Sequence, residues 1–225
     1  MDLDVFLAEL AAWSDEREPG FETVSYGEHP DQVVDVRRAG KRTAILVHGG
    51  FWRPAFTRAN TRALAVDLAL RGWTTWNVEY RRTGVADTLA DVDAALDLTG
   101  SGVAIGHSAG GHLVLWAAGT GKIDQAVSLA GVSDLARAAR DGIGANAAVE
   151  FAGPDPPAHA DPMRRLPLTV PVLLAHGTED DRVPFDYSRD FAAATGAELL
   201  TLPGAGHFEV IDPRTPEWEL IAARL

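Results

Sequence analysis

Short apolar runs recur along the chain, and each is followed by a turn rich in glycine or polar residues. A continuous apolar run of this length is typical of a parallel strand that is buried on both faces of a sheet. The pattern therefore predicts six such strands. They are expected at residues 43–47, 73–78, 103–105, 125–130, 171–175 and 198–202.

The segments between these runs have a helical period, with apolar residues three or four positions apart on one face. Leu64 and Leu68 mark one such helix, and Leu89, Val92 and Leu96 mark another that ends before Gly100. A helix at the start of the chain is expected to pack against the edge of the sheet. The helix at the start of the chain is expected at residues 2–17, and the helix with Leu64 and Leu68 at residues 57–71. Further helices are expected at residues 113–118, 186–194 and 216–224.

Two stretches depart from this alternation. Residues 24–26 and 32–37 have the composition of short strands, and the second alternates apolar with polar positions. We expect them to form an antiparallel pair at the sheet edge. Residues 136–168 show no clear period and contain a proline-rich turn, so we expect an irregular segment that acts as a lid or variable loop.

The order of strands and helices predicts an α/β fold, in which a doubly wound, mostly parallel sheet is flanked by helices on both faces. A chain of 225 residues with no interruption of this order suits a single domain over residues 1–225. Ligands of such sheets bind outside the carboxyl ends of the strands. The residues that follow the apolar runs are therefore the candidates for chemistry.

The clearest candidate is Ser108, which lies between a predicted strand and a predicted helix in the pattern Gly106-x-Ser108-x-Gly110. This is the nucleophile-elbow pattern, in which a serine sits on a tight, strained turn with its hydroxyl oxygen held clear of the backbone. The two glycines avoid collisions within that turn. The helix that follows points its amide-rich end toward the place where negative charge develops.

A serine hydroxyl needs a general base and a carboxylate that orients this base. His207 follows the last predicted strand in a glycine-rich loop, and we interpret it as the base. Three consecutive acids, Glu179, Asp180 and Asp181, follow the preceding strand, and only one of them can face His207. We favour Asp180, with Asp181 as the alternative.

The other histidines are expected to have structural roles. His107 should point away from the pocket, and His48 and His176 should bond to the backbone of the turns that they begin. No pair of histidines has a convincing metal-binding spacing, so we expect neither a metal nor another cofactor.

Stabilisation of an oxyanion needs two or three amides aimed at one point. Ala109 can supply one amide, and the loop with Gly50 and Phe51 can supply the others, because paired glycines leave the backbone unobstructed. Phe51 and Trp52, with Phe208 beside the base, are expected to form aromatic walls that bind the substrate.

Composition narrows the classes of partner. The formal net charge of −12 argues against binding to nucleic acid or to an anionic membrane. The absence of cysteine excludes disulfides and thiolate metal sites. The acidic N-terminus lacks a signal-type pattern and no apolar run could span a bilayer, so a cytoplasmic location is expected. The expected partner is a small-molecule substrate, and the oligomeric state, including a homodimer, stays open.

Four segments carry a resemblance to the α/β-hydrolase superfamily, and the chain is most similar to serine hydrolases of the kynurenine formamidase (arylformamidase) and small carboxylesterase type. The segments are 48–52, 106–113, 176–184 and 206–208. The order Ser108, Asp180, His207 is also the order of the triad in this superfamily. The resemblance implies the α/β-hydrolase fold, with these three residues as the catalytic triad and with three oxyanion donors. These donors would be Gly50, Phe51 and Ala109.

The chain departs from this pattern in two respects. Asp161-Pro162 stands where the related enzymes commonly have Ser-Pro, and residues 136–165 are too few for a large cap domain. The short segment argues against long-chain lipase activity. We therefore expect a serine hydrolase that cleaves a small ester or an aryl formamide through an acyl-enzyme. The alternatives are an acyltransferase in a biosynthetic pathway and a non-catalytic, hydrolase-like binding protein.

Overall fold

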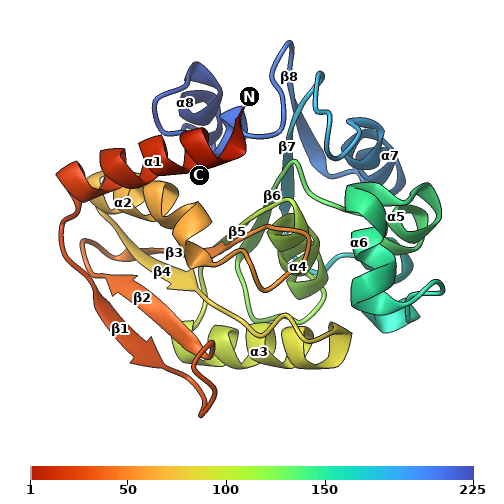
Figure 1. Ribbon diagram of the computed structural model, residues 1–225, viewed down its shortest axis with the longest axis horizontal. Coiled ribbons are helices and arrows are strands. Elements are labelled where there is room, and N and C mark those ends of the chain that lie inside the picture. The colour runs from red at the N-terminus through yellow and green to blue at the C-terminus, as the bar shows by residue number, and fades with distance from the viewer. Residues whose placement is uncertain (1) are drawn as a thin grey trace.

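The apolar runs form the central strands of one eight-stranded sheet in the computed structural model, which describes residues 2–225. The strand order across the sheet is β1-β2-β4-β3-β5-β6-β7-β8 (Figure 1). The strands are β1 (Glu22–Ser25), β2 (Val33–Arg37), β3 (Arg42–Val47), β4 (Trp73–Val78), β5 (Val103–His107), β6 (Gln125–Leu129), β7 (Val172–Gly177) and β8 (Glu198–Leu202).

Six strands, β3 to β8, are parallel, and the first two form one edge of the sheet, where only β2 runs in the opposite sense. Strand β2 pairs antiparallel with β4, where Val34 lies opposite Val78, and β1 pairs antiparallel with β2. The predicted doubly wound sheet and its antiparallel edge pair are both confirmed.

Helices cover both faces of the sheet (Figure 1). Within β3, Ala44 and Leu46 face the core with α1, α2 and α8, whereas Ile45 and Val47 face the core with α3 and α4. All four side chains are buried, because each face of a central strand is covered by helices. The helices are α1 (Leu3–Arg17), α2 (Arg62–Leu70), α3 (Val85–Thr99), α4 (Ala109–Ala117), α5 (Leu135–Asp141), α6 (Ile143–Ala152), α7 (Asp186–Thr195) and α8 (Pro216–Ala222).

The prediction for α1 was wrong in its position. The helix lies beside α2 on one face of the sheet rather than against the sheet edge (Figure 1). Phe6 and Leu10 are buried in the core of this face. A strand edge offers no apolar surface of this width, so the amphipathic helix packs where both residues can leave water.

Residues 136–168 are also more ordered than predicted, since they include α5, α6 and two short 3₁₀ turns, η2 (Ala158–Ala160) and η3 (Pro162–Arg164). The side chain of Asp134 accepts a hydrogen bond from Arg137 N at 2.7 Å and so caps α5. The buried carboxylate of Asp161 accepts from the backbone amides of Leu135 and Ala136, each at 3.1 Å. The alanine-rich sequence hid these helices because it has little hydrophobic period, and one of the two acids that cap α5, Asp161, is distant in sequence.

None of the helices among residues 2–225 combines the length and the apolar character that crossing a bilayer requires.

Candidate active site

The turn between β5 and α4 holds Ser108 in a conformation that side chains rarely adopt, with φ 55° and ψ −116°. Glycine is required on both sides of it. A Cβ atom on Gly106 would lie 2.1 Å from the carbonyl oxygen of Gly110, and one on Gly110 would lie 2.0 Å from the carbonyl oxygen of Val47. The turn is therefore as tight as the sequence pattern indicated, and its strain is typical of a functional position.

Ser108 lines a narrow pocket together with His207. The pocket has a volume of about 40 Å³, which is small beside the other cavities of the molecule. Among the hydrogen bonds of residues 2–225, none joins the Ser108 hydroxyl to His207. Such contacts are often long in a substrate-free enzyme and shorten when the substrate binds.

The imidazole of His207 is oriented by one acid. Its Nδ1 lies 2.7 Å from Oδ2 of Asp180, while Oδ1 of the same carboxylate accepts from the amides of Arg182 and Val183, each at 2.8 Å. The neighbouring Asp181 has a side chain that is 78% exposed and pairs with Arg182. Of the three consecutive acids, Asp180 is therefore the one in contact with the histidine.

A second histidine supports this carboxylate. His176 Nε2 lies 2.9 Å from the carbonyl oxygen of Val183 and 3.2 Å from Oδ2 of Asp180, and its Nδ1 lies 2.7 Å from Ser188 Oγ. Burial acts to raise the pKa of Asp180, but the hydrogen bonds from His176 and His207 outweigh it and hold the pKa well below its usual range. The carboxylate is therefore ionised when it faces His207.

Sequence reasoning assigned His176 only a bond to the backbone of its turn, and it missed the contact with Asp180. The spacing of four residues between them was a signal, but it is informative only once the bend after β7 is known.

The prediction that His107 points away from the pocket was wrong, because His107 lines the pocket. Its Nε2 donates to the carbonyl oxygen of His207 at 2.9 Å, and the two rings are 4.6 Å apart. Burial, aided by repulsion from His207, lowers the pKa of His107 to about 3, so the ring stays neutral. The hydrogen bond to the His207 carbonyl oxygen holds His107 at the pocket, and a contact across 100 residues is not visible in the local pattern.

The loop after β3 lies directly against this turn. A Cβ atom on Gly49 would lie 2.7 Å from the carbonyl oxygen of His107 and 3.0 Å from Cβ of Ser108. Within residues 2–225, the N–H groups of Gly50, Phe51 and Ala109 donate to no other protein group. Free amides beside Ser108 are what an oxyanion would require.

A buried charged network, which the sequence did not reveal, supports this loop. Glu79 Oε1 lies 2.9 Å from His48 Nε2, and Oε2 accepts from the amide of Arg58 at 2.9 Å. Tyr80 stacks on the His48 ring at 4.4 Å and donates its hydroxyl hydrogen to the carbonyl oxygen of His48 at 2.8 Å. Burial acts to raise the pKa of Glu79. The hydrogen bond and the electrostatic attraction from His48, together with the hydrogen bond from the Arg58 amide, outweigh burial and lower this pKa to about 2.

The prediction that Trp52 binds the substrate is not supported, because Trp52 lies outside the pocket. Its side chain is only 4% exposed and stacks on Phe151 at 4.7 Å within the core, outside the residues that line the pocket. Phe51 and Phe208 do line the pocket. Both Phe51 and Trp52 have positive φ angles, and this backbone twist turns the second aromatic side chain inward.

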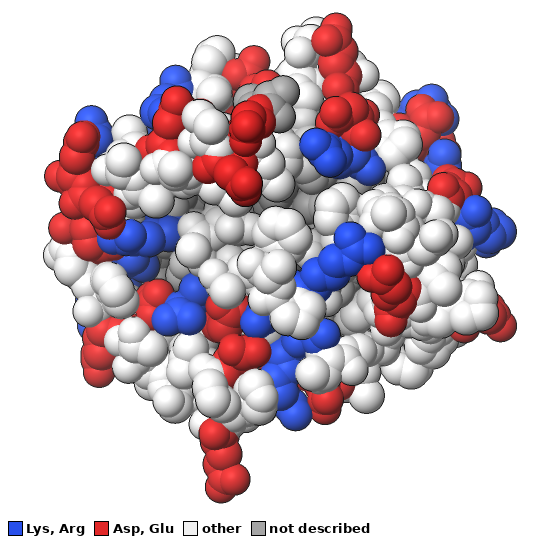
Figure 2. Space-filling model, viewed as in Figure 1, with Lys and Arg blue, Asp and Glu red and all other residues white. Residues whose placement is uncertain are grey.

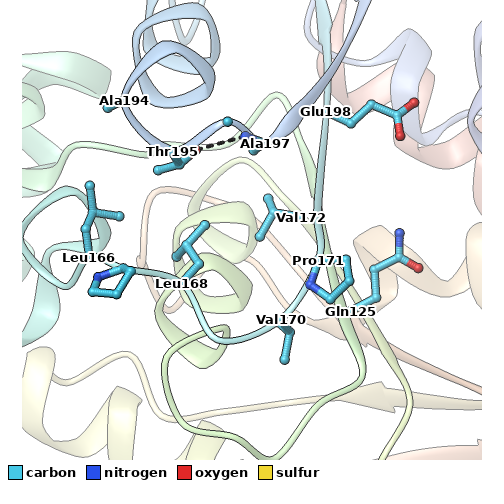
Figure 3. Close-up of a pocket in the computed structure, with 12 residues that line it drawn as sticks. Gln125, Leu166, Leu168, Val170, Pro171, Val172, Ala194, Thr195, Ala197 and Glu198 are labelled. Atoms are coloured by element: carbon cyan, nitrogen blue, oxygen red, sulfur yellow. Dashed lines mark hydrogen bonds between the residues drawn. The ribbon is translucent and has the colours of Figure 1, made fainter.

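Among residues 2–225, a cavity of about 710 Å³ lies at the amino ends of the strands, whereas Ser108 follows the carboxyl end of β5. Figure 3 shows this cavity. Its walls come from the amino ends of β6, β7 and β8, with Gln125, Val172 and Glu198, and from the loop before β7. Its lining contains no histidine and no serine, so it lacks the groups of a serine nucleophile and its histidine base.

The described residues 2–225 also contain no group of three or more histidine, aspartate or glutamate side chains arranged to hold a metal ion. Acidic side chains lie mainly around the margin of the face in Figure 2, and its centre is mostly uncharged.

Comparison with protein families gives a match to the prolyl oligopeptidase family over residues 79–223, which include Ser108, Asp180 and His207. Comparison with curated proteins gives no match.

Solved structures share the fold at low sequence identity. A thermophilic esterase from Thermogutta terrifontis, Est2, is 23% identical, with a TM-score of 0.73 and 92% of each chain covered. A putative thioesterase from Silicibacter sp. TM1040 is 22% identical, with a TM-score of 0.74, and the match covers 97% of this chain and 92% of that one. Esterase B from Lactobacillus rhamnosus is 20% identical, with a TM-score of 0.74, and the match covers 98% of this chain and 91% of that one. These likenesses establish the α/β-hydrolase fold, with no separate cap domain.

Proposed function

The chain belongs to the prolyl oligopeptidase family of α/β-hydrolase serine hydrolases, and from this premise we propose that it cleaves small acyl esters through an acyl-enzyme. The observation that carries the proposal is one small pocket lined by Ser108, by His207, which is paired with Asp180, and by Gly50 and Phe51, whose amides are free. The free amide of Ala109 directly follows Ser108.

Each group has a defined role in the proposed reaction. Ser108 Oγ attacks the carbonyl carbon while His207 Nε2 takes the hydroxyl proton, and the amides of Phe51 and Ala109 stabilise the oxyanion. Asp180 holds Nδ1–H and stabilises the imidazolium. The proton passes to the leaving alkoxide, which departs as an alcohol. Water, deprotonated by His207, then releases the acid from Ser108.

The size of the pocket supports a short acyl group. At about 40 Å³ the pocket is the smallest of the cavities described, so a short acyl group fits it better than a long chain, which would meet its walls. The leaving group has more room. An adjoining cavity of about 310 Å³ shares Phe51 and Arg182 with the pocket. The esterase names of the structural relatives agree with this choice of substrate.

An aryl formamide is the second candidate substrate. Phe51, Phe56 and Phe208 line the pocket, and such aromatic side chains favour a flat leaving group. Formyl is also the smallest acyl group that the narrow space could hold.

A matched set of substrates tests the function. We expect a phenyl acetate to be cleaved with a higher kcat/KM than the corresponding formanilide or an N-acylated peptide anilide, and we expect Ser108→Ala to abolish turnover. Faster cleavage of the formanilide would favour the second candidate. Faster cleavage of the peptide anilide, or full activity of Ser108→Ala, would refute the esterase proposal.

A fluorophosphonate probe gives an independent readout, because it reacts with an activated serine without needing the right substrate. Labelling should occur at Ser108 and disappear in Ser108→Ala. The T. terrifontis esterase is described as phosphonylated by sarin, a reaction of the same chemical type.

A further inference from the structure

The N-terminal helix α1 contributes two side chains to the pocket over the nucleophile. Leu3 and Leu7 are one helical turn apart, so they lie on the same face, and both line the pocket with Ser108 and His207. Both are partly buried. The helix therefore forms one wall of the candidate active site, although it is far from the catalytic residues in sequence.

The two ends of α1 are held in different ways. After the last turn, Glu18 makes two hydrogen bonds with Arg37, at 2.8 and 2.7 Å, and one with Arg62, at 3.2 Å. Near the first turn the main contact is apolar, between Phe6 and Phe208 with ring centroids 5.5 Å apart. Phe208 directly follows the proposed base. The helix is thus fixed at one end by charge and seated at the other end against the catalytic loop.

The pocket over Ser108 is much smaller than the adjoining cavity, so it is the space that would hold the acyl group. The leaving group must escape to solvent, and the larger cavity beyond Phe51 gives it a path. The acyl group stays bonded to Ser108 until water releases it, so it needs only the enclosed space of about 40 Å³. Leu3 and Leu7 border that space.

We propose that Leu3 and Leu7 set the length of the acyl group that the enzyme accepts. This inference rests on the proposed esterase function and assigns α1 a role in specificity that the catalytic residues do not supply. A methylene group that fits a pocket favours a substrate by about 10-fold or more, and a group that overlaps a side chain is excluded by a similar factor.

The test measures kcat/KM for p-nitrophenyl esters from acetyl to octanoyl in the full chain. We expect the parent protein to prefer acetyl, and Leu7→Ala and Leu3→Ala to raise the hexanoyl-to-acetyl ratio by about 10-fold or more. Val5→Ala is the matched control, because Val5 lies on the same helix, is 56% exposed and does not line this pocket. Its ratio should equal that of the parent.

Two further results keep the proposal falsifiable. Leu3→Phe should narrow the pocket and lower propanoyl turnover relative to acetyl, even if Leu7→Ala folds poorly. An unchanged ratio in all the leucine variants, or an equal shift in Val5→Ala, would overturn the role of Leu3 and Leu7.

The two proposals also fail separately. Fluorophosphonates with a short and a long alkyl chain report the size of the pocket without any turnover, and the leucine variants should label faster with the long one. Activity that does not depend on Ser108 would refute the hydrolase function, whereas an unchanged size preference of a Ser108-dependent enzyme would refute only the role of α1.

Discussion

His107 donates a hydrogen bond from Nε2 to the backbone carbonyl oxygen of His207, with 2.9 Å between the two atoms. The residue before the proposed nucleophile thus holds the loop that carries the proposed base. The contact links β5 to the segment after β8, across the carboxyl ends of the strands. It fixes the backbone of His207, while Asp180 fixes the ring.

Removal of this donor should misplace the base. We expect His107→Phe to lower kcat by about 10-fold to 100-fold, because a displacement on the order of 1 Å has this effect on a catalytic group. His107→Gln, which keeps a nitrogen donor at a similar reach, should retain most of the activity. Steady-state kinetics of both variants check this, and equal losses would show that packing rather than the hydrogen bond matters.

The neighbouring acids should differ sharply in importance. Asp180→Asn should lower kcat by about 10⁴-fold, since His207 would lose the anion that orients it. Asp181→Asn should have little effect, because the Asp181 side chain is 78% exposed and contacts only Arg182. A comparison of kcat for the two purified variants decides the assignment, and a larger loss in Asp181→Asn would contradict it.

The network beneath the oxyanion loop should contribute to both stability and turnover. Glu79→Gln removes the buried carboxylate that pairs with His48 and with the buried Arg82, and it should lower the free energy of unfolding by about 3 kcal/mol. Glu150→Gln removes an exposed partner of Arg53, and this substitution should change the free energy of unfolding by less than about 1 kcal/mol. Urea unfolding measures both values. A reduced kcat of folded Glu79→Gln would show that the loop amides have moved.

Stability should fall as the pH drops below neutrality. Burial lowers the pKa of His107 to about 3 and that of His112 to about 4, compared with 6.5 for an unperturbed histidine. Because the unfolded chain takes up these protons first, the stabilisation is complete above pH 6.5 and declines as the pH falls toward the folded values. The expected slope is about 2 to 3 kcal/mol per pH unit near pH 5 when both rings contribute.

Urea unfolding at pH 7.5, 6 and 5 measures this slope. His112→Gln should reduce it by about half, and the exposed His29→Gln should leave it unchanged. A free energy of unfolding that stays constant between pH 7.5 and 5 would contradict the prediction.

The sequence was sufficient for features that depend on local patterns. Continuous apolar runs located the parallel strands, and the spacing around Ser108 located the strained turn, because only glycine fits at Gly106 and Gly110. Features that depend on distant contacts were not predictable in this way. The position of α1 depends on the surface beside α2, and the helices within 136–168 depend on Asp161, which caps α5 from 26 residues away.

Aromatic residues show the same limit. Phe51 and Trp52 are adjacent in the same loop, yet one faces the pocket and the other lies in the core. Their directions follow from two consecutive positive φ angles, which composition does not reveal. Glu79 was missed for a related reason, since an acid after a strand is ordinarily solvated and here it is enclosed by the His48 loop.

The backbone angle at Ser108 has a consequence for the evolution and engineering of this chain. A side chain held at φ 55° and ψ −116° costs roughly 1 to 3 kcal/mol, whereas glycine adopts such angles freely. An inactive Ser108→Gly protein should therefore be more stable than the active one. Selection for thermostability alone would favour loss of the hydroxyl group, so a search for more robust variants has to screen activity at every round.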